Sequence, residues 1–166
     1  MAVFLLGANP TVADQTAQFP LGTEIADPRT RDLPGNIIRY VKANGTIAAN
    51  AAVRMDLTDE TNEPHAVLAT SATGQIVAGV NIVALSSSAS NNNVFGWITV
   101  KGKASVLTAA VTAGALLVTT ATAGTLDDFA TNTDVTAAII ASFSGPPIVT
   151  LDSTAATDGT LSVFVG

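Results

Sequence analysis

The sequence predicts an all-β fold: a single compact β-barrel or sandwich preceded by an extended N-terminal arm. Short runs of β-branched and aromatic residues recur along the chain, and Gly, Pro and Asn turn signals separate them. Four of the seven prolines fall in the first 36 residues, which lack a sustained hydrophobic period. A length of 166 residues suits one domain. We therefore assign residues 1–36 to the arm and residues 37–166 to one β-domain.

The arm carries spaced apolar anchors between its prolines. Proline fixes φ, removes a backbone donor and pushes the preceding residue toward extended structure, so the segment is not expected to be helical. The anchors are Val3, Phe4, Leu5, Leu6, Phe19, Leu21 and Ile25. Such an arm packs on another surface. The sequence leaves open whether that surface is its own domain or a neighbouring chain.

The β-domain begins with two predicted strands. The first covers Asn36–Val41, and the Asn44-Gly45 dipeptide after it is a strong hairpin signal. The second covers Ala51–Leu57. Its alternation places Val53, Met55 and Leu57 on one face and Arg54 and Asp56 on the other.

The longest β-type run is Phe95–Val118. Its alternation places Trp97 and Thr99 on one face and Ile98 and Val100 on the other, and Gly102 interrupts it. Gln75–Leu85 is uncharged and predicts a fully buried strand, and at most one short helix is expected, at 127–131 with Thr125 as its cap. Further apolar runs that suit strands occupy residues 66–70, 135–143, 148–151 and 161–165.

A weak internal repeat relates the two parts of the domain. Ile47 corresponds to Val111 (111 − 47 = 64), and Trp97 corresponds to Leu161 (161 − 97 = 64). If this similarity reflects structure, two related halves share one barrel or sandwich.

The composition favours a protein that works within an assembly. Hydrophobic residues make up 48% of the chain but aromatic residues only 5%, so the core is built from small side chains with little burial each. Charged residues are 12%, well below the usual quarter, and the net charge is −6. The part after Lys103 has acids and no bases, so we expect no direct nucleic-acid binding.

The expected compartment follows from three further observations. The chain has no cysteine, which excludes disulfides and thiolate chemistry. Its start has no basic region followed by a long apolar run, and no stretch has the length of a membrane helix. We therefore expect assembly in the cytoplasm and no membrane contact.

No catalytic constellation is evident in the sequence. His65 is the only histidine and has no Gly-x-Ser-x-Gly motif to accompany it, so a surface-loop histidine is the favoured interpretation. The acids at 56, 59, 60 and 63 lack the spacing of a calcium loop, and a weak cation site is the alternative to solvated charge. We therefore expect no cofactor, no metal site and no enzymatic activity. Trp97 suits a core position, with partial exposure at a subunit interface as the alternative.

Three segments together resemble one family. They are Phe19–Thr23 (FPLGT), Tyr40–Asn50 (YVKANGTIAAN) and Gly96–Gly102 (GWITVKG), followed by the Ala/Gly/Thr-rich stretch 107–124. This pattern resembles the small Ala/Gly/Thr-rich capsid decoration (cement) proteins of tailed bacteriophages, over roughly residues 19–166. The resemblance implies a compact β-domain, a homotrimer, and a position on the capsid exterior over junctions between major capsid proteins. Residues 1–18 lie outside it.

The sequence thus leads to a structural protein of the virion as the first hypothesis. Its arm and one face of its domain would cover seams between subunits of the major capsid protein. A head-fibre or tail-fibre base domain that attaches to a host surface is the alternative, and an enzyme such as a glycan hydrolase has little support. The residues expected at capsid or subunit contacts are Val3, Phe4, Leu5, Leu6, Phe19, Leu21, Arg29, Arg31 and Trp97.

Overall fold

A computed structural model describes residues 8–29, 35–57, 65–87, 92–109, 111 and 116–128, together with the backbone of two later strands. The predicted all-β class is confirmed, since the described residues form strands and turns and no helix. The strands are β1 (Glu24–Ala26), β2 (Ile37–Ala43), β3 (Ala52–Met55), β4 (Ala66–Ala69), β5 (Gly79–Asn81), β6 (Phe95–Thr108), β7 (Leu117–Thr119), β8 (Leu126–Asp128), β9 (Ile148–Thr150) and β10 (Gly159–Val165).

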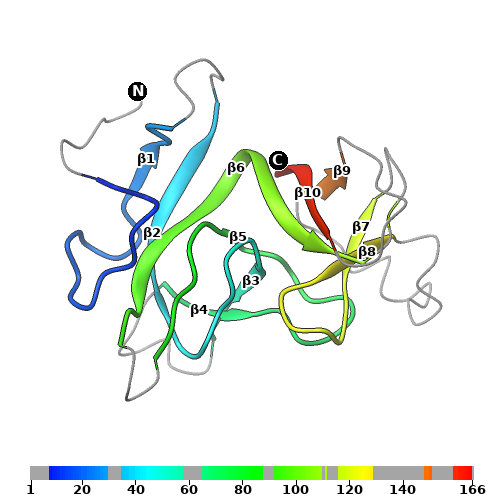
Figure 1. Cartoon of the computed structure of the whole chain (residues 1–166), viewed down its shortest axis with the longest axis horizontal. Coiled ribbons are helices and arrows are strands. Elements are labelled where there is room, and N and C mark those ends of the chain that lie inside the picture. Colours follow the sequence, from blue (N-terminus) through cyan, green and yellow to red (C-terminus); the bar gives the residue numbers. More distant parts are fainter. Residues whose placement is uncertain are drawn as a thin grey trace.

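Five strands close into a barrel in the order β2–β4–β3–β5–β6, with β6 returning to pair with β2 (Figure 1). All neighbours in this ring are antiparallel except β2 and β4, which run parallel. Closure pairs every strand of the ring on both sides, but β2 meets β4 over only two residues, so the start of β2 keeps a free edge within the ring. One buried cluster comes mainly from these strands and the loops between them: Val41, Ala43, Ile47, Ala51, Val53, Val67, Leu85 and Ile98.

β6 is the strand on which the molecule is built. It runs for 14 residues without interruption, and it bends sharply as it leaves the barrel (Figure 1). Its first part pairs with β2 and β5, and its second part pairs with β10 over Gly102–Thr108. The break in register with β2, where Ile37 faces Lys101 and Ile38 faces Thr99, marks a bulge at the bend.

Gly102 makes the bend of β6 possible. Its φ is +97°, a left-handed conformation that a residue with a Cβ rarely adopts. Asn36 occupies the space beside it, and a Cβ on Gly102 would lie 2.0 Å from Asn36 Oδ1. From this position the Asn36 side chain makes two hydrogen bonds to the backbone of Lys103, the residue after Gly102. Its Nδ2 donates to the Lys103 carbonyl and its Oδ1 accepts from the Lys103 N–H, both at 2.8 Å.

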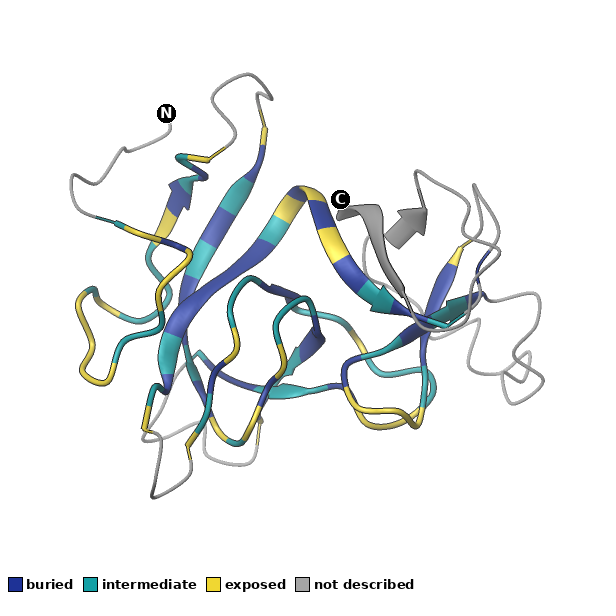
Figure 2. Ribbon diagram, viewed as in Figure 1, coloured by how far each residue is buried: buried dark blue, intermediate teal, exposed yellow. Residues whose placement is uncertain are grey.

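Two further cores lie outside the barrel. One joins the barrel to the second part of β6 and to β7 and β8, where buried and exposed residues alternate along β6 (Figure 2). It consists of Ala52, Val80, Ala104, Val106, Val111, Leu117 and Leu126. The other lies on the outer face of β2 and β6, beneath the N-terminal segment, and consists of Ile25, Ile38, Tyr40 and Trp97.

Several strand predictions are confirmed, with differences in their ends. The first predicted strand corresponds to β2, and the second corresponds to β3. Burial does not alternate along β3, since Ala52 and Val53 are both buried and Arg54 and Met55 are both half-buried, and after the strand Asp56 is buried and Leu57 is 67% exposed. The run 75–85 forms only the three residues of β5, and Ile76 within it is exposed.

Three other expectations are corrected by the topology. Asn44-Gly45 does not join a hairpin, because β2 pairs with β1, β4 and β6 but not with β3. The short helix expected at 127–131 is wrong at its first two residues, since Asp127 and Asp128 belong to strand β8. Gly102 bends β6 but does not end it. The run 135–143 lies outside the described residues.

The barrel is not closed by two repeated halves. All five strands of the ring lie between Ile37 and Thr108, and the later strands are additions to it. In the described part of the chain there is no helix long and apolar enough to cross a membrane.

Candidate functional site: the docked N-terminal segment and a polar pocket

The N-terminal segment, defined here as residues 8–29, is attached to the outside of the barrel by backbone hydrogen bonds. Asp14 and Phe95 exchange two of them, at 2.8 and 3.0 Å. Further along, Gly22 donates to the Tyr40 carbonyl at 2.8 Å, and β1 pairs with β2 over three residues. The segment therefore adds a strand to the barrel wall at the position where the sequence predicted an extended arm.

An aromatic cluster lies beneath the segment. Phe19 contacts Tyr40 edge-on and tilts against Trp97, each with ring centroids 5.3 Å apart, and the Tyr40 and Trp97 rings are 5.0 Å apart. At these separations aromatic pairs stabilise the fold by more than the burial of their apolar surface alone provides. Leu21 packs on the same cluster. The sequence left open which surface the arm anchors contact, and for Phe19 and Leu21 it is the chain's own barrel.

Tyr40 links the aromatic cluster to the segment through its hydroxyl. The hydroxyl donates to Asp14 Oδ2 at 2.7 Å and accepts from the Gln18 N–H at 3.2 Å. Burial raises the pKa of Tyr40 well above its ordinary value, and the Asp14 side chain adds to the increase. The neutral phenol is therefore the form that holds the segment in place.

His65 also contacts the N-terminal segment. The His65 imidazole covers Gly22, and a Cβ built on Gly22 would lie 2.4 Å from His65 Nε2. His65 itself has a φ of +69°. His65 lies in a turn, as expected for a loop histidine, but it is half-buried and packs against Gly22. The described residues contain no group of three or more His, Cys, Asp or Glu that could hold a metal ion.

The predicted contact residues do not form one surface. Phe19, Leu21 and Trp97 meet in the aromatic cluster, where Trp97 is only 1% exposed and forms part of the core. Arg29 lies apart from them in an ion pair with Asp27. Val3, Phe4, Leu5, Leu6 and Arg31 lie outside the described residues.

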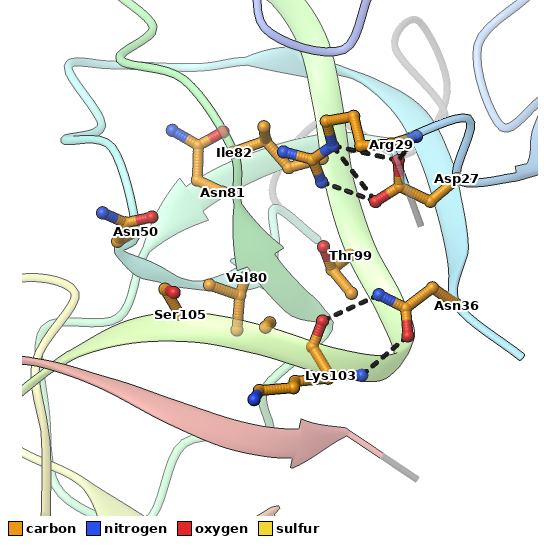
Figure 3. Close-up of a pocket in the computed structure, with 11 residues that line it drawn as sticks. Asp27, Arg29, Asn36, Asn50, Val80, Asn81, Ile82, Thr99, Lys103 and Ser105 are labelled. Carbon is orange, nitrogen blue, oxygen red and sulfur yellow. Dashed lines mark hydrogen bonds and ion pairs between the residues drawn. The ribbon is translucent and has the colours of Figure 1, made fainter. Parts of the chain in front are cut away.

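A polar pocket opens where the second part of β6 separates from β5 (Figure 3). Its volume is about 300 Å³, and its lining residues are Asp27, Arg29, Asn36, Asn50, Val80, Asn81, Ile82, Thr99, Lys103, Ala104 and Ser105. The bend at Gly102 creates this space, since the inner part of β6 stays paired to β5 at Val80↔Thr99 while the outer part leaves with β10.

Charge within the pocket is largely balanced. The Asp27 side chain is fully buried, and Arg29 donates to it from its backbone N–H, Nε and Nη2 at 2.6–3.2 Å. Lys103 is exposed at the rim. The pocket therefore presents one unneutralised cation beside neutral amides and hydroxyls.

Sequence reasoning did not identify this pocket. Its residues come from five separate segments, and none belongs to a motif. One signal was available: Asn81 stands alone in an uncharged apolar run, and a buried amide needs partners for all its polar atoms.

The fold defines the protein as a small all-β barrel with an N-terminal segment attached to its outer wall. No protein-family model matches the chain, and no curated protein and no solved structure is significantly similar to it.

Proposed function

We propose that the protein is a non-enzymatic virion protein that decorates the outer surface of a tailed-phage capsid and stabilises contacts between major capsid proteins. The proposal is supported most by the N-terminal segment, which is attached to the barrel through Asp14, Gly22 and β1. A rigid attachment at residues 8–29 gives the seven residues before it a fixed starting point on the barrel. Those residues include the apolar run Val3–Leu6, which would contact the shell.

The surface of the domain suits attachment to a large body. The whole chain has 12% charged residues, and among the residues that the structure describes four large apolar side chains are exposed: Val12, Leu57, Ile76 and Leu116. Such side chains stabilise an assembly when a partner covers them. Because many copies bind one particle, modest affinity for each contact is sufficient to stabilise the shell.

The structure refines which deletion tests the arm. Removing residues 1–18 would also remove Asp14 and the bond from Gln18 to Tyr40, and so would disturb the domain itself. Deleting residues 1–7 leaves every described contact of the segment in place. We expect this variant to fold normally and to occupy fewer sites on capsids assembled from the major capsid protein. Equal occupancy by the full chain and the variant would refute the role given to Val3–Leu6.

An electron-microscopy map of the intact particle tests the location directly. Density for the barrel over junctions of the shell, in groups of three, is the expected result. Density at the tail or on a fibre would favour the alternative of a fibre base domain. The mass of the free protein in solution separately tests the homotrimer.

A further inference from the structure

The pocket contains a buried acceptor without a hydrogen-bond partner. Asn81 is 1% exposed, and its Nδ2 donates to the carbonyls of Ala48 and Val83 at 2.9 and 2.6 Å. These two bonds fix the orientation of the amide. Its Oδ1 is left with no partner. In Figure 3 this oxygen points to the side of the pocket where Ile82 and Arg29 lie, and the nitrogen points away. An unpaired buried acceptor is costly, so the site favours a ligand that donates a hydrogen bond.

The edge of β6 presents a second polar feature to the same pocket. Peptide groups alternate in direction along a strand, so residues 103, 105 and 107 direct theirs to one side. On that side Asn36 bonds Lys103 and the Asn50 carbonyl accepts from the Leu107 N–H, both away from β10. By this alternation the peptide group of Ser105, between these two filled positions, should face the side of β6 on which Ser105 lines the pocket. Here the pocket offers both a donor and an acceptor.

The hydrogen-bonding groups of the pocket, more than its charge, argue for a neutral ligand. Arg29 is paired with Asp27, which leaves Lys103 at the rim as the remaining cation of the pocket. A phosphate or carboxylate would place only acceptors against Asn81 Oδ1 and the Ser105 carbonyl. A hydroxyl group both donates and accepts, so it satisfies either kind of partner.

We propose that this pocket binds a single saccharide unit. Hydroxyls around one sugar ring can donate to Asn81 Oδ1 and exchange bonds with the Ser105 peptide group, while the C–H face packs on Val80 and Ile82. The volume of about 300 Å³ is at the small end of ligand pockets and suits one ring, not an oligosaccharide. With few atoms to bind, the expected Kd is on the order of millimolar. This activity is independent of capsid attachment.

The test is an NMR titration of the full-length ¹⁵N-labelled protein with single sugars: glucose, galactose, mannose, N-acetylglucosamine and glucuronate. We expect at least one to cause saturable shifts at the Ser105 amide and the Asn81 side-chain NH₂. Inorganic phosphate is the comparison for an anion site and glycerol for a non-specific polyol. Saturable shifts with phosphate but not with sugars would overturn the proposal. So would the absence of shifts with every sugar, which would mean that water alone fills the pocket.

A pair of variants on one strand provides the matched control. Ser105→Trp places a large side chain at the pocket, and Lys101→Trp places the same side chain at another exposed position of β6 outside it. Tryptophan is well tolerated in strands, so both should fold. We expect Ser105→Trp to weaken sugar binding at least tenfold and Lys101→Trp to leave it unchanged. Equal binding by both variants would place the sugar elsewhere and refute the assignment.

Discussion

Replacing Gly102 with alanine tests how the bend of β6 is stabilised. At a φ of +97° an alanine adds backbone strain on the order of 1–3 kcal/mol. Its Cβ would also lie 2.0 Å from Asn36 Oδ1, so the Asn36 side chain must leave and lose both bonds to Lys103. At about 1 kcal/mol for each bond, these two effects amount to about 3–5 kcal/mol, and the loss is at least this large because the Cβ would also lie 2.8 Å from Asn36 Cα.

Gly35 is the matched control for Gly102. It has a φ of +120°, and nothing lies within 4 Å of a Cβ built on it. Gly35→Ala should therefore cost only the backbone strain, at least about 2 kcal/mol less than Gly102→Ala. Urea unfolding followed by the fluorescence of Trp97, the single tryptophan, measures both.

A double-mutant cycle isolates the role of Asn36. The two bonds to Lys103 can be lost only once, so Gly102→Ala should cost about 2 kcal/mol less in an Asn36→Ala background than alone. Additive losses in the cycle, or equal losses at Gly35 and Gly102, would refute the explanation.

Three smaller predictions concern the N-terminal segment. Tyr40→Phe removes the bonds to Asp14 and Gln18 and should cost about 1–3 kcal/mol, with faster proteolysis of the segment than of the barrel as the measurement. The raised pKa of Tyr40 makes the protein lose stability above about pH 10, because the tyrosine of the unfolded chain deprotonates there and that of the folded chain does not. This loss should be absent in Tyr40→Phe. Tyr40 is the single tyrosine, so tyrosinate absorbance reports its titration. Arg39→Ala breaks an exposed ion pair with Glu24 and should change the free energy of unfolding by less than about 1 kcal/mol, whereas a larger change would mean that β1 depends on it.

The sequence predicted the all-β class and the main strands because their signals are local. Strand residues bounded by Gly and Asn are visible in the chain itself, as at β2 and β6. It did not predict the order of strands, because the parallel pairing of β2 with β4 depends on contacts between distant residues. Asn44-Gly45 shows the limit: a turn signal bends the chain but does not determine which strand comes next in the sheet.

The alternation correctly placed Trp97 and Ile98 on opposite faces of β6, but it could not show that both faces are covered. Trp97 and Ile98 are adjacent and both buried, one under the N-terminal segment and the other in the barrel. An alternating pattern has only one buried face, so it cannot describe a strand enclosed on both sides. Asp56 is buried, and Asn44 Nδ2, 12 positions away in the chain, offsets the cost by donating to its carboxylate.

The division of β6 between two sheets gives the molecule two units that can open separately. β10 pairs with seven residues of the outer part of β6 and with β9, and it makes no pair with a strand of the ring beyond β6. Its release therefore leaves the barrel closed, as expected for a local opening unit. The same edge of β6 would then accept β10 from a second copy. Exchange of this strand between copies needs no unfolding of the ring and builds no new type of contact.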